Sequence, residues 1–230
     1  MSEILVEKLD SATKQKELVV KAGEDLTLII FNKGFRDISY NLKASIAKDA
    51  KLNIYNVVTS KYKTQLTEEV TMNGENGNCN ILNVLLSYED GTIDSNIMIH
   101  HDVELTTSEF NNYAIALDNA SMILNNNATI KKGAKGTVVH QRAKGLTLSE
   151  NAKIKAMPNL FIDEYDVIAA HAASIGSISK DDLFYLMRRG LTLEEASKLI
   201  VLGFVQPLLD KIDNKELRKE IKQNFEEKLS

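Results

Sequence analysis

Cysteine, proline and tryptophan are nearly absent from this sequence, and each absence limits what the chain can be. Among 230 residues there are one cysteine, two prolines and no tryptophan. The single cysteine, Cys79, excludes an intramolecular disulfide and a four-cysteine metal site. Because the prolines are Pro158 and Pro207 and there are only eleven glycines, few turns can depend on either residue type. Other residues must therefore make most of the turns.

Long apolar runs and a strong charge of one sign are missing as well. No segment approaches the roughly 18 apolar residues that mark a membrane-spanning helix. The first ten residues, MSEILVEKLD, lack the basic flank and apolar run of a signal peptide. A formal charge of −4, with no Lys/Arg run longer than two residues, argues against a nucleic-acid partner. We expect a soluble, cytoplasmic protein that binds neither membranes nor nucleic acids.

From about Asp25 to Ile162 the sequence alternates between apolar and polar residues. This period of two, in short β-branched runs divided by Asn, Gly and Asp, predicts many short strands. The runs are residues 25–32, 37–47, 50–60, 78–88, 95–105, 112–124 and 153–163. Asparagine is plentiful, as in 125–127 and at Asn76, and it tolerates the left-handed backbone of tight corners.

A weak internal echo points to a solenoid. Segments 48–54, 118–124, 132–138 and 150–156 each place an alanine after a turn residue and then alternate apolar positions. Their spacing is irregular, so no clean hexapeptide repeat is present. On periodicity alone, a stacked parallel β-helix and an antiparallel sandwich or barrel remain nearly equal alternatives.

After about residue 178 the apolar period changes to 3.6, which predicts helices. Ser179 with Asp182 and Thr192 with Glu195 form capping-box patterns, and Gly190 closes the first helix. Asp213 with Glu216 begins a third helix. Pro207 is expected to kink or limit the second helix. The predicted organisation is a β body over residues 1–168 and a C-terminal helical segment over residues 169–230.

The residues that could carry chemistry are few. In His100-His101-Asp102, neighbouring side chains on a strand point to opposite faces, so at most His100 and Asp102 could share a metal. We interpret these residues as solvated strand residues and His140 as a surface residue. Residues 133–136 lack the spacing of a phosphate loop, and Cys79 is interpreted as a small buried apolar residue. No Ser–His–Asp order or paired-carboxylate motif indicates an enzyme.

Residues 148–206 resemble the C-terminal signature of the SufB/SufD family, the scaffold proteins of the SUF iron–sulfur cluster assembly system. The matching positions follow one another in order over about a quarter of the chain. They are Leu148, Ser149, Ala152, Pro158, Leu160, Ile162, Asp166, Val167, His171, Ala173, Gly176, Leu183, Phe184, Tyr185, Leu186, Arg189, Gly190, Glu194, Glu195, Ala196, Gly203 and Phe204.

The resemblance implies a right-handed parallel β-helix core followed by a helical segment. It also implies two partners: a SufC-like ABC ATPase, and a second SufB/SufD-type subunit in a homodimer or heterodimer paired through the β-helices. The residues implied in ATPase docking are Leu183, Phe184, Tyr185, Arg189, Leu199, Ile200 and Phe204. His171 is implied as a ligand for iron or a transient iron–sulfur cluster, shared across the subunit interface. No intrinsic cofactor is expected.

The chain also departs from the family pattern. The cysteine that receives sulfur in SufB proteins would fall near Ala143, and no cysteine is there. Ala170 and Ala172 flank His171 where SufB members carry glutamates, so the site resembles that of SufD. We therefore expect a non-catalytic scaffold subunit. The alternative is a structural or regulatory ATPase-binding relative that assembles no cluster. A β-helical polysaccharide lyase would need clustered charged residues along one face, which the sequence does not offer.

Overall fold

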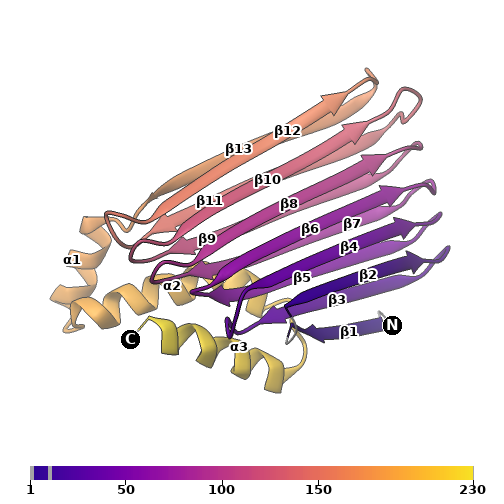
Figure 1. Ribbon diagram of the computed structural model, residues 1–230. Coiled ribbons are helices and arrows are strands. Elements are labelled where there is room, and N and C mark those ends of the chain that lie inside the picture. Colours follow the sequence, from indigo (N-terminus) through magenta and orange to yellow (C-terminus); the bar gives the residue numbers. More distant parts are fainter. Residues whose placement is uncertain (1–2, 10–11, 230) are drawn as a thin grey trace.

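The computed structural model describes residues 3–9 and 12–229, and in them a run of strands precedes three helices (Figure 1). The strands are β1 (Glu3–Lys8), β2 (Thr13–Val20), β3 (Asp25–Asn32), β4 (Ile38–Ile46), β5 (Lys51–Ser60), β6 (Lys63–Met72), β7 (Asn78–Ser87), β8 (Thr92–His101), β9 (Thr107–Ala116), β10 (Ser121–Ile130), β11 (Thr137–Thr147), β12 (Lys153–Ile162) and β13 (Val167–Ser177). The helices are α1 (Lys180–Arg188), α2 (Leu193–Leu209) and α3 (Lys215–Lys228).

Successive strands alternate between two parallel sheets. Sheet A has the order β1-β3-β5-β7-β9-β11-β13, and sheet B has the order β12-β10-β8-β6-β4-β2. Every described strand pair is parallel, so the chain coils in a flattened parallel β-helix, with the turns stacked in chain order (Figure 1). The predicted β-helix with C-terminal helices is therefore confirmed, and the antiparallel sandwich is wrong.

The core lies between the two sheets, where the inward residues of neighbouring turns stack in register. Leu28, Ile54 and Ile81 follow one another on β3, β5 and β7 and are all buried. Alternation along each strand sends the next residue outward, as the period of two requires. The turns vary in length: bonded register partners on neighbouring turns are 26 residues apart at Thr27–Asn53 and 32 apart at Asn127–Asn159. This variation explains why the sequence shows no clean repeat.

The expectation that asparagines form the corners is only partly correct. Asn76 has a left-handed φ of 57° and donates from Nδ2 to Oδ1 of Asp49 in the corner of the preceding turn, at 2.9 Å. The run at 125–127 instead lies inside β10. There Asn127 donates to Asn96, at 3.3 Å, and accepts from Asn159, at 2.9 Å. Asparagines thus also stack along the strands and connect successive turns.

The β-helix extends further at its C-terminal end than predicted. Strands β1 and β2 precede the alternating pattern that begins near Asp25 but lie within the predicted β body over residues 1–168, whereas β13 runs to Ser177, beyond the expected boundary at residue 168. Residues 169–177 are therefore strand and not helical segment, and the first helix begins at Lys180. The alanines of this segment pair in register with β11, so β13 adds one more strand to the edge of sheet A.

The predicted starts of the first two helices are confirmed. Oγ of Ser179 accepts from the amide of Asp182 at the start of α1. Thr192 and Glu195 form a reciprocal capping box at the start of α2. Gly190 follows α1 with a φ of +99°, a backbone conformation that favours glycine.

The start of the third helix differs from the expectation. Asn214, not Asp213, caps α3, because its Oδ1 accepts from the amides of Glu216 and Leu217. Helix α2 continues through Pro207 and ends at Leu209, so the proline lies in its last turn.

Helices α2 and α3 cover part of the outer face of sheet A (Figure 1). A second apolar cluster joins Val201, Val205, Leu208, Leu217, Ile221 and Phe225 of these helices to the outward residues Phe31, Val57, Val84, Leu86 and Ile115 of the sheet. Helix α1 packs against α2 and contains no buried residue. Over the described part of the chain, no helix combines the length and the apolar character needed to cross a bilayer.

Candidate functional site

The last turn of the β-helix is open. Among the described strands β13 pairs only with β11, and β12 pairs only with β10, so each keeps a free edge. Neither strand contains a buried residue. We call these two free edges and the side chains along them the C-terminal rim (upper end in Figure 1). Free parallel edges of this kind are templates for pairing with another chain.

His171 lies in the middle of this rim. It pairs in register with Gln141 of β11, whose side chain points inward and is buried, so His171 continues the inward row on the last turn. Its side chain is exposed because no further turn covers it. The histidine therefore belongs to a strand and sits over the end of the β-helix interior.

No metal-binding set surrounds His171 within the chain. In residues 3–9 and 12–229, no cluster of three or more His, Cys, Asp or Glu side chains could hold a metal ion. Ala170 and Ala172 flank the histidine, and Ala143 lies inward on β11 with an exposed fraction of 3%. An imidazole is a good ligand for iron, but one imidazole cannot hold a metal alone. Any metal site at His171 must take its other ligands from another molecule.

The residues expected to dock the ATPase fall into two groups. Phe184, Tyr185, Arg189 and Leu199 are exposed, with 62% and 58% of the surface of the two aromatic residues accessible to solvent. Leu183, Ile200 and Phe204 are half-buried, and the Phe204 ring meets the Tyr113 ring edge-on with centroids 5.3 Å apart. Phe204 therefore helps to hold α2 against sheet A.

Arginines hold the exposed aromatic rings of α1. The guanidinium of Arg189 lies 5.1 Å from the centre of the Tyr185 ring and donates to its hydroxyl at 2.8 Å. The guanidinium of Arg188 lies 5.6 Å from the centre of the Phe184 ring. Met187, Leu193 and Leu199 are also exposed on α1 and α2, and we call these residues with Phe184 and Tyr185 the helical patch. Large exposed apolar side chains gathered on two neighbouring helices are typical of an interaction site.

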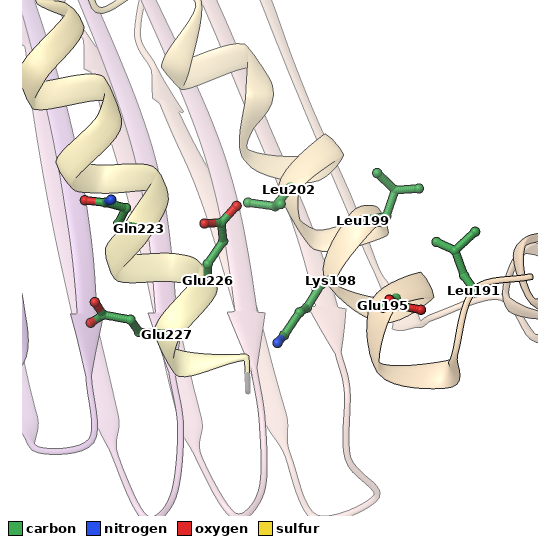
Figure 2. A pocket seen from close by; sticks show the side chains of 8 residues that line it. All are labelled: Leu191, Glu195, Lys198, Leu199, Leu202, Gln223, Glu226 and Glu227. Atoms are coloured by element: carbon green, nitrogen blue, oxygen red, sulfur yellow. The ribbon is translucent and has the colours of Figure 1, made fainter.

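A groove between α2 and α3 adjoins the helical patch (Figure 2). It has a volume of about 720 Å³ and combines apolar side chains with charged ones. Its lining residues are Leu191, Glu195, Lys198, Leu199, Leu202, Gln223, Glu226 and Glu227. Of these, only Leu199 was expected from the sequence. Apart from Leu191 in the loop before α2, the others come from two helices, and a pattern read along one helix does not show which faces meet.

The histidines at 100 and 101 point to opposite faces, as expected. His100 is half-buried on the outer face of sheet B, with Nδ1 2.9 Å from Thr129 Oγ1 and Nε2 3.4 Å from Glu69 Oε1. His101 is fully buried, against the expectation of a solvated residue, and its ring nitrogens contact the hydroxyls of Thr106 and Ser108. Burial lowers the pKa of His101 to about 4.

Asp102 and Cys79 have structural surroundings. Asp102 is 2.7 Å from Lys131 Nζ, so His100 and Asp102 have separate partners and do not converge on one metal. Cys79 is fully buried in the core, and burial raises the pKa of its thiol well above the usual range. The interpretation of Cys79 as a small apolar residue is confirmed.

A buried polar row inside the β-helix was not expected from the sequence. Asn56, Asn83 and Asn112 stand inward on β5, β7 and β9 and bond to one another at 2.7 Å. Asn56 also donates to Glu68 Oε1 at 2.8 Å. Glu68 is 1% exposed, and burial raises its pKa to about 7. The signal in the sequence that could have predicted this row is the presence of polar residues at the inward positions of otherwise apolar strands.

Comparisons with known proteins agree with this architecture. The family model described as "SUF system FeS cluster assembly, SufBD core domain" matches residues 10–204. The chain is 38% identical over 117 residues to the iron–sulfur cluster assembly protein SufD of Bacillus subtilis, covering 51% of this chain and 27% of that protein. It is 31% identical over 172 residues to an iron–sulfur cluster assembly SufBD family protein of Pyrococcus horikoshii. These residues cover 74% of this chain and 38% of that protein.

A SufBD family protein of Mycobacterium bovis is 25% identical over 194 residues, which cover 81% of this chain and 49% of that protein. The chain thus spans less than half the length of each of these three relatives. The resemblance seen at residues 148–206 is confirmed, and the family model extends it to most of the β-helix. The chain belongs to the SufBD family of the SUF iron–sulfur cluster assembly system.

Proposed function

We propose that this chain is a non-catalytic scaffold subunit of a SUF iron–sulfur cluster assembly complex. It pairs with a second SufB/SufD-type subunit through the C-terminal rim and binds a SufC-like ABC ATPase through its C-terminal helices. The observation that carries the proposal is the position of His171 on an open, unpaired turn of the β-helix.

The rim is suited to pairing. The inward positions of β12 and β13 hold apolar or small residues and one histidine, among them Ile154, Ala156, Pro158, Leu160, Ile162, Val167, Ala169, His171, Ala173 and Ile175. A second subunit could add strands to both free edges and cover these side chains at once. His171 would then lie between two subunits, where the partner supplies the missing ligands for iron or a nascent cluster.

Anaerobic reconstitution tests the role of His171. The chain, copurified with a SufC-like ATPase and any second scaffold subunit, is supplied with iron and sulfide. We expect iron uptake by the wild type, loss of most of it in His171→Ala, and retention in the control His140→Ala, which changes an outward residue of neighbouring β11. Equal iron in the wild type and His171→Ala would remove the ligand role.

The helical patch and the adjoining groove support the proposed ATPase contact. Phe184, Tyr185 and Leu199 expose large apolar area on α1 and α2. We expect the double variant Phe184→Ala/Tyr185→Ala to lose copurification with the ATPase without a change in circular dichroism. The control is Phe35→Ala, which removes an exposed aromatic ring outside the helices. Undiminished copurification of the double variant would contradict docking at this patch.

The second candidate function is a structural or regulatory ATPase-binding subunit that assembles no cluster. Ala143, where the resemblance would place a sulfur-accepting cysteine, favours it. The same reconstitution decides between the two: an ATPase complex that never takes up iron supports the second candidate.

A further inference from the structure

The opposite end of the β-helix has free strand edges too, but it is built differently. Among the described strands β1 pairs only with β3 and β2 pairs only with β4. We call these two edges and the side chains along them the N-terminal rim (lower end in Figure 1). Left bare, such an end could pair with another molecule as readily as the C-terminal rim.

Charged side chains lie across the inside of the N-terminal rim. Glu7 of β1 points inward and is 7% exposed, and Lys14 and Lys16 of β2 reach it from the other sheet. Lys14 Nζ lies 2.8 Å from Glu7 Oε1, and Lys16 Nζ lies 3.1 Å from Glu7 Oε2. The buried hydroxyl of Tyr40, on the next turn, donates to Glu7 Oε2 at 3.3 Å. We call Glu7, Lys14 and Lys16 the N-terminal cap.

The register shows that the cap occupies core positions. Lys14 and Lys16 pair with Tyr40 and Leu42 of β4, both of which are buried inward residues. The two ammonium groups are partly hydrated, with side chains 34% and 28% exposed. A second β-helix stacked on this rim would strip that water from the charged groups, which is strongly unfavourable unless new partners replace it. Inward-pointing charge is also a known device of edge strands against association.

The two rims therefore differ in the charge of their inward-pointing side chains, which controls stacking. The inward positions of β12 and β13 contain no Lys, Arg, Asp or Glu, whereas three of those on β1 and β2 form an ion-paired cluster. A molecule with two adhesive ends would join others head to tail or end to end without closing, whereas a molecule with one adhesive end closes as a pair.

We propose that the N-terminal cap keeps this end of the β-helix from pairing, so that association stops at a closed pair instead of continuing into filaments. The proposal rests on the proposed function in one respect, the adhesive C-terminal rim. The partner that the cap excludes is a second copy of this chain.

The test removes the cap without leaving a buried charge alone. In the triple variant Glu7→Gln/Lys14→Met/Lys16→Met, methionine keeps the length of lysine and makes the rim apolar. The matched control Lys43→Met/Lys63→Met/Glu69→Gln removes the same charges from the outer face of sheet B. Light scattering measures the mass of the assembly. We expect the mass of the triple variant to be at least about twofold that of the wild type and to increase with protein concentration. The control should match the wild type.

A folded triple variant with the mass of the wild type at every concentration would overturn the proposal. If the triple variant loses its β-sheet circular dichroism, the single variants Lys14→Met and Lys16→Met take its place, because Glu7 keeps one lysine in each. A rise in mass with concentration supports the cap, and an unchanged mass overturns it. If the wild-type protein remains a monomer, both alone and when mixed with other subunits, the proposed pairing at the C-terminal rim is contradicted. That result is separate from the effect of the cap.

Discussion

Glu68 is a carboxyl group that the fold removes from water almost completely. It stands inward on β6, with one oxygen bonded to Asn56 and the other without a hydrogen-bond partner among the described residues. Burial outweighs the hydrogen bond from Asn56, so the pKa rises to about 7. When the pKa of a carboxyl group is higher in the folded state, the protein loses stability as the pH rises from the pKa of the unfolded state toward the pKa of the folded state.

We therefore expect Glu68→Gln to stabilise the protein at pH 8 and to leave it almost unchanged at pH 4. The gain at pH 8 is on the order of 3 kcal/mol, from a pKa raised from 4.5 to about 7 at about 1.4 kcal/mol per pKa unit. Urea unfolding at both pH values measures it. The control Glu69→Gln changes the adjacent carboxyl group, which is exposed on the outer face, and should alter stability by much less. Equal effects of the two variants would show that Glu68 is not the cause.

His101 has the opposite dependence on pH. Its folded pKa is about 4, below the ordinary value of 6.5, because burial disfavours the charged ring. The unfolded chain therefore binds a proton between these values and the folded chain does not, so stability falls as pH drops from 6.5 to 4. The total loss is on the order of 3 kcal/mol.

The measurement is best made in the Glu68→Gln background, because Glu68 acts in the opposite direction over part of the same pH range. His101→Gln in that background should flatten the pH dependence of unfolding between pH 6.5 and 4. An unchanged slope would assign the acid sensitivity to other groups.

At the level of elements, the helices are attached to the β-helix by a few large side chains. Phe225 of α3 is fully buried in the cluster on the outer face of sheet A. Near it in α3, Asn224 Oδ1 accepts from Thr59 Oγ1 of β5 at 2.5 Å. Helix α3 is thus fixed to the sheet by an apolar contact and a buried hydrogen bond together.

We expect Phe225→Ala to lower the free energy of unfolding by about 3–5 kcal/mol, the usual cost of a cavity left by a buried phenylalanine. Phe184→Ala is the control, because that ring is exposed and its removal opens no cavity. Thermal unfolding followed by circular dichroism compares the two. Similar melting temperatures would show that α3 does not depend on this contact.

The elements differ in how much of them the sequence predicts. Capping patterns at Ser179 and Thr192 locate two helix starts correctly, because capping depends on neighbours three residues away. The strand at 167–177 escapes a local reading, because AAHAA has no alternation of apolar and polar residues. Only its register with β11 shows that the segment is a strand.

The candidate site follows the same rule. The place of His171 in the resemblance predicts an interface residue, but its position on an open rim depends on the stacking of turns far apart in sequence. The groove of α2 and α3 and the cap of Glu7 with Lys14 and Lys16 are likewise products of tertiary packing. Local patterns cannot supply them.

For the whole molecule, stability should vary along the β-helix axis. Each turn of a solenoid contacts mainly its neighbours, and the last turn has one neighbour instead of two. Strands β12 and β13 contain no buried residue, whereas nine of the ten residues of β5 are buried. Local opening should therefore be easiest at the C-terminal rim.

Hydrogen exchange tests this gradient. We expect the amides of β12 and β13 to exchange fastest among the strands and those of β5 and β7 slowest. Addition of a partner that pairs with the rim should slow β12 and β13 selectively. Uniform exchange along the axis would contradict the gradient, and unchanged exchange of β12 and β13 in the complex would place the contact elsewhere.

The return of α3 to the first turns has a consequence for how the chain folds. Lys8 of β1 and Lys33, after β3, both pair with Glu220 of α3, across as many as 212 residues of sequence. During synthesis the N-terminal strands emerge long before the helix that covers Phe31, Tyr55 and Val57. Contacts so distant in sequence make folding slow, and the uncovered apolar face is prone to aggregation in the interval. The nascent chain is therefore most dependent on protection by chaperones just before α3 is made.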